Sequence, residues 1–359
     1  MDELSFHELD DENLRTLLLT GQRDRGEFVR RCGGYSGNIY VFRYSPQTYP
    51  SHICAKVPKT SRSVDPLEAA QRFLREMKIQ RRLFYQQFVH WPFDFDFILD
   101  APVAWFRLWD GDLSQLIEDP SFTVTGRLSM LAYITAGMMH CHRTGLVAHQ
   151  DFKPENIFVR DLRQAFRDVP EVDVFRIPKI ADFGSANLAA EKGIFRGTRP
   201  YMAVEQWDKK PLGQHTTVWS IGVMTYELLS YGRHPIGEPS RPWRDEEPHV
   251  IQRWQDDRMW KRWRETGMVP ATPLADSDMD GFVRECLRSE PATRPTLDAA
   301  LERLLRRLRS ESPEAYDQAR FRITHAEHEA KDDYVWPYLD ERYEWLVDQV
   351  TRYFEKKIA

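Results

Sequence analysis

The chain has 359 residues, 42% of them hydrophobic and 29% charged, with a formal net charge of −5 at pH 7. This length allows two domains or one two-lobed unit with an ordinary core, so the chain need not be a small fold held by disulfides or metal. The slightly acidic balance argues against nucleic-acid or anionic-membrane partners, and apolar runs such as 221–229 are too short to span a bilayer.

The cysteines and the N-terminal residues indicate where the protein resides. Its four cysteines are far apart, without a Cys-x-x-Cys pair, at Cys32, Cys54, Cys141 and Cys286. That spacing predicts reduced, mostly buried thiols and no structural zinc. The first residues, MDELSFHELDDENLR, are acidic where a secretory signal would be basic and then apolar. We therefore expect a cytoplasmic protein.

The first third of the chain has the pattern of a small β-rich lobe. Residues 1–25 form an acidic lead-in that is expected to be helical, because Leu14, Leu17 and Leu18 fall on one helix face. Short apolar runs bounded by turn residues then predict strands, and these lie at 40–44, 53–57, 95–99 and 103–108. A helix is predicted from Pro66 to Phe84. The small lobe is expected to span residues 26–108.

After Gly111 the pattern becomes mostly helical. The predicted helices lie at 113–117, 127–143, 219–231, 250–264, 279–287 and 297–308. A β-rich lobe followed by a larger helical lobe at 109–309 is an α+β arrangement. The remaining tail, 310–359, is expected to be a C-terminal helical extension. Its amphipathic helix between Leu339 and Phe354 is predicted to lie back on the large lobe, with partner binding as the alternative.

A glycine cluster precedes the first clear strand in RCGGYSGNIYV, residues 31–41. Glycines between strands let the backbone approach a bound group and direct N–H donors at phosphate oxygens. The spacing of Cys32, Gly34, Gly37 and Ile39 resembles G-x-G-x-x-G-x-V with Cys in the first place, and Gly33 adds to the cluster. A tight hairpin without any ligand is the alternative.

A single lysine, Lys56, lies inside the apolar strand ICAKV. Burying its ammonium is costly unless it is paired. Glu76 follows 20 residues later, on the predicted helix, and could supply the partner. Such a pair beside a glycine loop would place a fixed positive charge where the α- and β-phosphates of a nucleotide lie. A lysine that extends to solvent from an edge strand is the alternative.

Polar residues with complementary chemistry gather in VAHQDFKPENIFV, residues 147–159. Asp151 could accept a hydroxyl proton, and Lys153 could neutralise charge on a transferred phosphoryl group. Asn156 and Asp182, the latter in KIADFGSAN, are oxygen ligands of the kind that Mg²⁺ shares with substrate phosphates. Either aspartate alone would more often be a turn or capping residue; the set in this order indicates phosphoryl transfer.

These motifs resemble, in order, those of the eukaryotic-type (Hanks-type) serine/threonine protein kinases, from about Gly33 to Leu308. The resemblance implies a bilobal kinase fold, ATP and Mg²⁺ as cofactors, and serine or threonine of a protein as the acceptor. It implies an ion pair of Lys56 with Glu76, Asp151 as catalytic base, Lys153 as the phosphate-neutralising lysine, and Asn156 and Asp182 as metal ligands.

The same resemblance implies the nucleotide and peptide contacts. Around the nucleotide it places Cys54 and Ile39 on one side of the adenine, Phe158 on the other, Asp112 at the ribose, and Trp105 or Phe106 at the back. Thr198, in the segment 197–205, would help to position the peptide, and Glu205 would pair with Arg294. Lys153 two places after the aspartate, together with Thr198, fits serine/threonine rather than tyrosine specificity.

Gln150 replaces the arginine of the family's H-R-D motif, which makes this a non-RD variant. In the family that arginine receives a phosphate from the activation loop. Here the loop 186–197, ANLAAEKGIFRG, contains no Ser, Thr or Tyr. Because phosphosite and receptor are absent together, we expect catalysis that does not need activation-loop phosphorylation.

Two further departures leave alternatives open. Thr217 stands where the family has an aspartate that holds the catalytic loop, and Gln80 occupies a usually apolar position on the helix of Glu76. They favour a nucleotide-binding pseudokinase or scaffold as the second hypothesis, whereas the complete set of motif residues favours the enzyme. A small-molecule kinase is a third. The tryptophan-rich stretch, with Trp254, Trp260 and Trp263, would be helix core or, as the sharper alternative, a partner surface.

Overall fold

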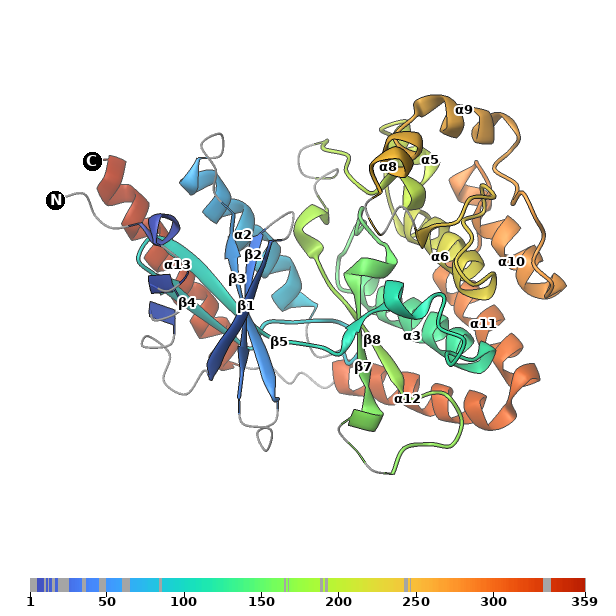
Figure 1. Ribbon diagram of the computed structural model, residues 1–359, viewed down its shortest axis with the longest axis horizontal. Helices are drawn as coiled ribbons and strands as arrows, with labels where there is room; N and C mark the ends of the chain where they lie inside the picture. The colour runs from blue at the N-terminus through green and yellow to red at the C-terminus, as the bar shows by residue number, and fades with distance from the viewer. Residues whose placement is uncertain are drawn as a thin grey trace. The chain divides into compact units, whose positions relative to one another are not determined.

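The computed structural model describes residues 5–358 apart from 10, 12, 15–16, 19–25, 34–36, 45–49, 60–64, 84–85, 165, 167, 188–189, 191–192, 242–244, 246 and 332–336. The chain divides into two compact units (Figure 1). The small unit comprises Met1–Phe84, Trp91–Trp109 and Asp333–Ala359, and the large unit comprises Tyr85–His90 and Asp110–Asp332. The predicted order, a small β-rich unit and then a larger helical one, is confirmed.

The small unit is built on a five-stranded antiparallel sheet in the order β1-β2-β3-β5-β4. Its strands are β1 (Glu27–Gly33), β2 (Gly37–Arg43), β3 (His52–Pro58), β4 (Asp94–Ile98) and β5 (Ala101–Arg107). The helix α2 (Pro66–Arg82) begins as expected, because Asp65 caps it by accepting the backbone N–H of Leu67 at 3.1 Å and Pro66 fits the first turn.

Both faces of this sheet are buried, each under a different cover. Side chains alternate along β3, so Ile53, Ala55 and Val57 share one apolar cluster with Phe6 of η1 (Phe6–Glu8) and with Leu14 of the lead-in. Leu14 and Leu18 are buried and helical, as the periodicity of the lead-in predicts. Cys54, on the opposite face, belongs to a second cluster with α2 and with α13 (Pro337–Ile358).

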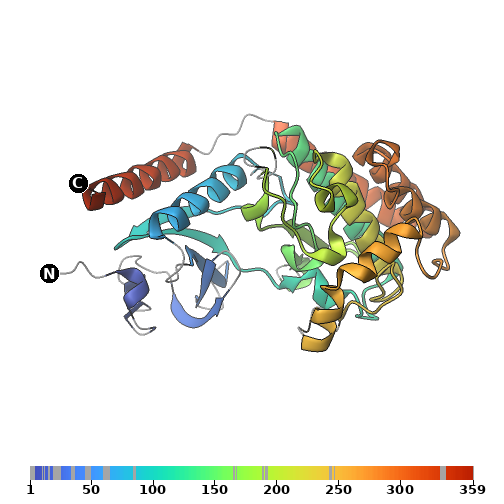
Figure 2. The same cartoon turned by 90° about the horizontal axis from the view of Figure 1, so that it is seen from above.

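The large unit is mainly helical (Figures 1 and 2). Its helices are α3 (Val124–Arg143), α5 (Val204–Trp207), α6 (Gln214–Leu229), α8 (Pro248–Trp254), α9 (Asp257–Glu265), α10 (Ser277–Cys286), α11 (Leu297–Glu311) and α12 (Pro313–Lys331). The short 3-10 turns are η2 (Leu113–Leu116), η3 (Pro154–Asn156), η4 (Leu162–Gln164), η5 (Phe183–Ser185), η6 (Arg199–Tyr201) and η7 (Pro291–Thr293). α3 and α6 are buried on nearly all sides, which fits the distribution of their apolar residues around each helix rather than along one face.

The large unit also contains a three-stranded sheet of β6 (Gly111–Asp112), β7 (Ile157–Asp161) and β8 (Arg176–Ile180), and Asn156 directly precedes β7. β7 and β8 form the extended hairpin that the long separation of Asn156 and Asp182 predicts, with Ile157 opposite Ile180. Residues 88–90 also pair with β8, because Ile180 donates to the carbonyl of Phe88 at 2.8 Å. This strand pairing puts residues 86–90 in the large unit rather than in the lobe 26–108.

Two element predictions differ from the structure. The segment 113–117 forms the 3-10 turn η2 instead of an α-helix. The helix predicted over 250–264 is two helices, α8 and α9, because Asp256 accepts the N–H of Arg258 at 2.9 Å and so starts a new helix. Trp254, Trp260 and Trp263 are buried, as expected for helix core and not for a partner surface.

The position of the C-terminal helix is the main correction. α12 packs against α3 and α11 in the large unit, as expected for the tail. The prediction that the amphipathic helix of Leu339 to Phe354 lies on the large lobe is wrong, because α13 belongs to the small unit and packs on α2 and β4. Periodicity identifies an apolar face, but it does not say which surface will cover that face.

Candidate active site

Lys56 and Glu76 form a buried ion pair inside the small unit. Lys56 projects from β3 on the face that α2 covers, and the two side chains are only 11% and 4% exposed. A charged side chain this deeply buried is stable only when an opposite charge pairs with it. The ion pair with Glu76 therefore explains why a lysine can lie in an apolar strand. Lys56 is therefore not a solvent-directed edge residue.

The glycine cluster is only partly described. Gly37 must be glycine for packing, since a Cβ there would lie 2.7 Å from the carbonyl oxygen of Val57 on β3. Gly33 has open space where a Cβ would stand, so packing does not explain it. Cys32 is half-buried and accepts a hydrogen bond from Arg30 at 2.7 Å. Gly34 lies outside the described residues, and the phosphate-loop hypothesis stays a prediction.

One face of the small sheet gathers the residues expected around the adenine. Cys54 lies two places before Lys56 on β3, and Ile39 packs against the same cluster. Burial raises the pKa of the Cys54 thiol to about 12, so it is an inert apolar group. Phe106 is paired with Cys54 and shares this cluster, whereas Trp105 faces the opposite core and donates to Asp96 at 2.7 Å. The register therefore favours Phe106 over Trp105.

In the large unit, three neighbouring side chains hold the carboxylate of Asp151. The hydroxyl of Thr198 donates to Oδ1 at 2.7 Å, the ammonium of Lys153 lies 3.3 Å from Oδ2, and Nδ2 of Asn156 lies 3.3 Å from the same oxygen. Lys153 also donates to Thr198 at 2.8 Å. Burial would raise the pKa of Asp151, but Lys153 and the Thr198 hydrogen bond outweigh it and lower that pKa below 3.8. The group is thus an ionised proton acceptor at neutral pH.

The backbone before Asp182 is held from two sides. Ala181 donates its N–H to the carbonyl of Asn156 at 2.9 Å, and its own carbonyl accepts from Nε2 of His149, also at 2.9 Å. His149 is fully enclosed, and burial lowers its pKa, so its imidazole is neutral. The residue after this clamp, Asp182, has a left-handed backbone with φ of 59°. His149, which carries no role in the sequence-based prediction, is therefore a positioning group for Asp182.

The donor set fits a magnesium ion shared with phosphates. Nδ2 of Asn156 is engaged by the carbonyl of Asp151 at 2.8 Å, which leaves the amide oxygen as the atom that Asn156 can offer to a metal. Among the described residues there is no group of three or more His, Cys, Asp or Glu that could hold a metal by itself. One amide oxygen and one carboxylate, with phosphate oxygens and water as the further ligands, match the coordination preference of Mg²⁺. Zinc prefers nitrogen and sulfur ligands from the protein.

Gln150 connects the two ends of the activation segment. Its Nε2 donates to the carbonyl of Ser185 at 2.8 Å, and its Oε1 accepts the N–H of Arg196 at 3.0 Å. Its backbone is left-handed, with φ of 67°, a costly conformation for a residue other than glycine. These two neutral hydrogen bonds join Ser185, just before the loop 186–197, to Arg196 near the end of that loop.

A second glutamine, Gln206, holds the backbone of Gln150. Its Nε2 donates to the carbonyls of Gln150 and Arg196, both at 2.8 Å, and its Oε1 accepts the N–H of Ala203 at 3.0 Å. A Cβ at Gly197 would lie 2.5 Å from the carbonyl oxygen of Gln150, so only glycine permits this close passage. Sequence reasoning missed Gln206, because no local pattern signals a side chain that bonds residues 56 positions away.

The substituted position Thr217 is used differently from the expectation. Its hydroxyl is 2.9 Å from Nε2 of His142, at the end of α3, and no hydrogen bond to the catalytic loop is found for it among the described residues. Burial lowers the pKa of His142 to about 4, so this histidine is neutral. The contacts that hold the catalytic loop come from His149 and Gln206 instead.

The segment 197–205 is anchored by the expected ion pair of Glu205 with Arg294. Arg294 makes two parallel hydrogen bonds to the carboxylate of Glu205, at 2.8 and 2.9 Å, and both side chains are essentially inaccessible to water. Bidentate geometry of this kind is strong and directional. It holds α5 against the segment that precedes α11, and hence the chain that leads from Thr198.

The remaining predicted nucleotide contacts lie in the large unit. Asp112 ends β6 and caps η2, accepting the N–H of Ser114 at 2.9 Å. Phe158 is on β7, with its ring edge-to-face against His90 at a centroid distance of 5.2 Å. The roles of Asp112 and Phe158 toward a ligand stay predictions.

Gln80, which departs from the apolar residue usual in the family, is buried on α2 of the small unit.

Comparison with known families defines the class. The model of the protein kinase domain matches residues 34–305, well over half of the chain. The chain therefore belongs to the protein kinase family, and the relatives place it with the eukaryotic-type serine/threonine kinases.

Three relatives illustrate the similarity. The chain is 26% identical over 245 residues to calcium/calmodulin-dependent protein kinase type I of Schizosaccharomyces pombe, covering 66% of either chain. It is 30% identical over 218 residues to serine/threonine-protein kinase Pkn1 of Myxococcus xanthus, covering 58% of this chain and 29% of the relative. It is 25% identical over 223 residues to serine/threonine-protein kinase 1 of Lymantria dispar multicapsid nuclear polyhedrosis virus, covering 59% and 72%.

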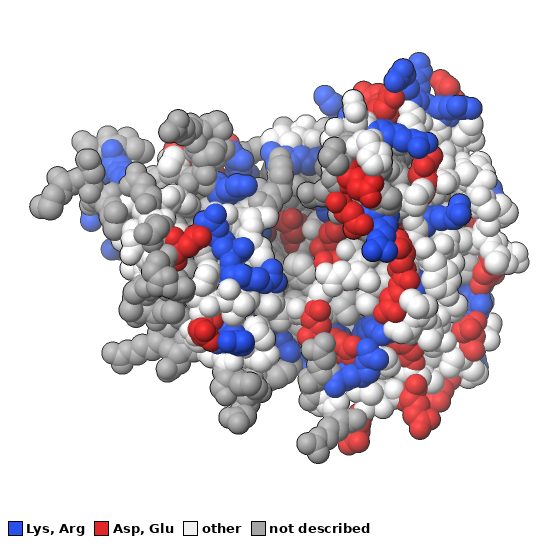
Figure 3. All heavy atoms as spheres, in the orientation of Figure 1, with Lys and Arg blue, Asp and Glu red and all other residues white. Residues whose placement is uncertain are grey.

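The surface and helices add two observations. Over the face visible in Figure 3, acidic and basic side chains are interspersed, without one extended positive field. Among the helices of the described chain, none combines the length and apolar character needed to cross a bilayer.

Proposed function

We propose that this protein is an ATP- and Mg²⁺-dependent kinase that transfers the γ-phosphoryl group to serine or threonine of a protein. The observation that carries the proposal is the ionised carboxylate of Asp151, which Lys153, Thr198 and Asn156 surround. We further propose cytoplasmic localisation, on the four free cysteines, and no nucleic-acid or membrane partner, on the charge balance of the chain.

In this proposal the large unit supplies the groups at the transferred phosphoryl. Asp151 accepts the proton of the attacking hydroxyl, and Lys153 offsets the negative charge of the phosphoryl oxygens. When bound, Mg²⁺ neutralises charge on the β- and γ-phosphates, and Asn156 and Asp182 are the residues that would hold it. Thr198, which now donates to Asp151, would help to orient the hydroxyl of the substrate.

The small unit supplies the groups at the rest of the nucleotide. Lys56, held by Glu76, provides a fixed positive charge for the α- and β-phosphates. The glycine segment, with Cys32, Gly33, Gly34 and Gly37, would direct backbone donors at them. For the adenine and ribose we propose Ile39, Cys54, Phe158 and Asp112.

Activity without activation-loop phosphorylation is supported by the hydrogen bonds of Gln150. In an arginine-containing relative, a phosphate must arrive before a cation can clamp the loop. Here the amide of Gln150 already binds Ser185 and Arg196, and Gln206 secures the same backbone. A neutral amide satisfies backbone donors and acceptors directly and would gain little from an added phosphate.

One assay distinguishes the proposed kinase from the alternative, a nucleotide-binding scaffold without catalytic activity. Purified protein is incubated with Mg²⁺, labelled ATP and a generic protein substrate, beside Asp151→Ala and Lys56→Met. We expect transfer by the wild type and a loss on the order of 100-fold or more in each variant, because base and phosphate positioning are removed. Equal background in all three, with ATP still raising the melting temperature of the wild type, would establish the scaffold.

Phosphorylation independence has its own measurement. Phosphatase treatment of the purified kinase, followed by removal of the phosphatase, should leave the initial rate unchanged, because residues 186–197 offer no hydroxyl to modify. Mass spectrometry before and after treatment serves as the control for complete dephosphorylation. A rate that falls severalfold and returns on re-incubation with ATP would contradict the proposal.

A further inference from the structure

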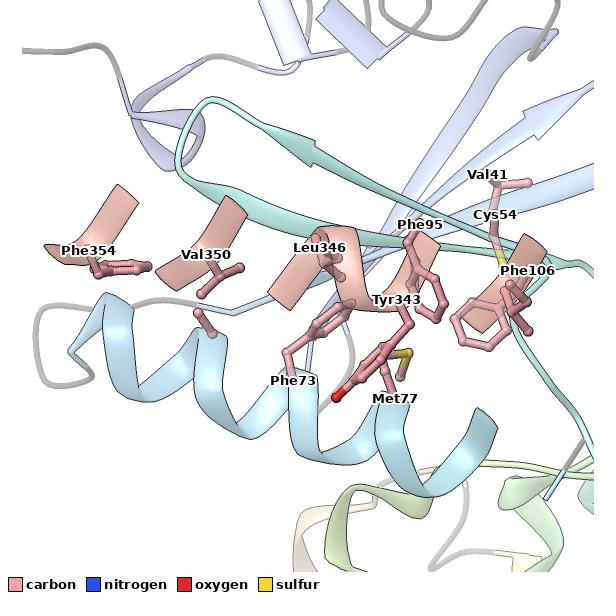
Figure 4. Packing of buried hydrophobic residues seen from close by; sticks show 13 residues of the cluster. Val41, Cys54, Phe73, Met77, Phe95, Phe106, Tyr343, Leu346, Val350 and Phe354 are labelled. Atoms are coloured by element: carbon pink, nitrogen blue, oxygen red, sulfur yellow. The ribbon is translucent and has the colours of Figure 1, made fainter. Parts of the chain in front are cut away.

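The C-terminal helix α13 covers the face of α2 that carries the residues on either side of Glu76. One stripe of apolar residues, spaced three or four positions apart along α13, is buried: Leu339, Tyr343, Leu346, Val350 and Phe354. They share one core with Ala70, Phe73 and Met77 of α2 and with Phe95 and Phe106 of the sheet. Figure 4 shows the ring of Tyr343 among Phe73, Met77 and Phe95, and Figure 2 shows the two helices side by side.

Polar contacts add direction to this packing. The hydroxyl of Tyr343 donates to the backbone carbonyl of Leu74 on α2 at 2.9 Å, and Arg81 of α2 lies 2.5 Å from the carboxylate of Asp340. The guanidinium of Arg81 also lies over the ring of Tyr343, 4.7 Å from its centroid. Apolar packing alone would tolerate rotation of a helix, whereas these contacts specify one orientation.

The same N-terminal part of α13 also contacts the sheet, through Arg342. Arg342 donates to Asp94 at 3.0 Å and to Asp96 at 3.1 Å, both on β4. These carboxylates are about 10% exposed, so the ion pairs are shielded from solvent and salt more than surface pairs are. α13 therefore contacts sheet and helix together, and it can transmit the position of one to the other.

Glu76 lies in the part of α2 against which α13 packs. Phe73 and Met77, three residues before it and one after it, are in the shared core, and the bonded carbonyl of Leu74 is two residues before it. Because a helix is stiff over one turn, a rotation or shift of α2 moves the Glu76 carboxylate with it. The ion pair with Lys56 then depends on where α13 holds the helix.

We propose that α13 is a built-in positioning element that holds α2 where Glu76 pairs with Lys56. This deepens the proposed function, since it rests on Lys56 and Glu76 acting in catalysis. In this proposal α13 covers the apolar face of α2 within the same chain, so no second protein is needed to order that helix. Tyr343 and Leu346 are then positioning residues that act through Glu76.

The test uses the full-length protein with Leu346→Asp and, as a matched control, Thr351→Asp on the exposed face of the same helix. Hydrogen exchange is followed in α2 and, for comparison, in α3. We expect Leu346→Asp to speed exchange in α2 but not in α3, because it places an unpaired charge in the shared core. Unchanged protection of α2 would overturn the proposal whether or not the protein is a kinase.

Kinetics show whether the effect passes through Glu76. Leu346→Asp should lower kcat on the order of 10- to 100-fold, as expected for misplaced reacting groups, and Thr351→Asp should not. Glu76→Gln should lower kcat similarly, and Leu346→Asp added to Glu76→Gln should cost little more. If the fold-losses in kcat of the two single variants multiply in the double variant, α13 acts independently of Glu76 and is only a structural helix. Absence of activity in the wild type would instead count against the proposed function alone.

A charge exchange keeps the test informative if Leu346→Asp fails to fold. Asp340→Arg places two cations together beside Tyr343, so α2 exchange should accelerate and kcat should fall severalfold. The double variant Arg81→Asp with Asp340→Arg restores the opposite charges and should recover most of both. Failure of this rescue, with both variants folded, would contradict the role of α13 in setting the position of α2.

Discussion

Gln150 lies one residue before the proposed catalytic base, and its side chain contacts Ser185 just before the loop 186–197 and Arg196 near the end of that loop. Comparison with the H-R-D motif shows only that Gln150 stands where the family has an arginine. Its amide bonds to Ser185 and Arg196 give it a positive role, and Gln206 and Gly197 are the residues that permit its strained backbone. At the residue scale, two neutral hydrogen bonds stand where the arginine of the family would receive a phosphate, and they support the proposed independence of phosphorylation.

Replacing Gln206 tests this arrangement. Gln206→Leu leaves the carbonyls of Gln150 and Arg196 and the N–H of Ala203 without their partner, which costs about 1–3 kcal/mol for each group that stays buried. We expect kcat to fall on the order of tenfold or more, since the peptide bond before Asp151 is released, while the KM for ATP changes little. Steady-state kinetics measure both.

The exposed Gln252 on α8 offers a control for that experiment, because Gln252→Leu makes the same chemical change in a solvent-facing position. Its kinetics should match those of the wild type. A Gln206→Leu enzyme with unaltered kcat would mean that the catalytic loop is held adequately without this amide.

At the element scale, periodicity predicted where most helices and strands lie, and local capping decided where they end. Helix α2 begins at Pro66 as predicted, since its signals, Asp65 and Pro66, are neighbours in sequence. The division of 250–264 into α8 and α9 could also be found locally, from Asp256, but an apolar pattern that continues across the break conceals it. The register of the strands could not be predicted from local sequence. Only the pairing of β3 with β5 shows that Phe106, and not Trp105, lies on the same face of the sheet as Cys54.

The destination of α13 shows the limit of reasoning from one element. Its apolar face is evident from Leu339 to Phe354, yet an apolar stripe fits any complementary surface. Only the packed small unit brings Phe73, Met77 and Phe95 together into the surface that receives it. For that reason the proposed control of α2 emerges from the structure, whereas the ion pair of Lys56 with Glu76 could be anticipated from motif spacing.

At the scale of the whole molecule, buried histidines make stability depend on pH. Burial lowers the pKa of His234 to about 4, and this imidazole accepts the N–H of Ile236 at 3.1 Å and bonds the carbonyl of Pro200 at 2.8 Å. In the unfolded chain the same group titrates near 6.5, so below that pH the unfolded state binds more protons. The contribution of His234, up to roughly 3 kcal/mol, is therefore lost as the pH falls from about 6.5 towards 4.

We expect the urea midpoint of the wild type to decline between pH 7.5 and 5.5, and His234→Gln to be less stable at pH 7.5 but less sensitive to pH over this range. Tryptophan fluorescence follows the transition, since Trp254 and Trp260 lie against His234. His249→Gln, at a side chain that is 80% exposed, should reproduce the wild-type profile. Parallel pH profiles for all three proteins would assign the acid sensitivity to other groups.

The sequence by itself determined the family of this protein and predicts its chemistry. Lys56, Glu76, Asp151, Asn156 and Asp182 are recognisable because side-chain type and order along the chain define phosphoryl-transfer motifs. The tertiary structure decided how those groups are held: Gln206 and His149 reach the catalytic loop from distant positions, and α13 reaches α2. The physical reason is that a hydrogen bond or an apolar contact depends on distance in space, and side chains far apart in sequence leave no local pattern to announce it.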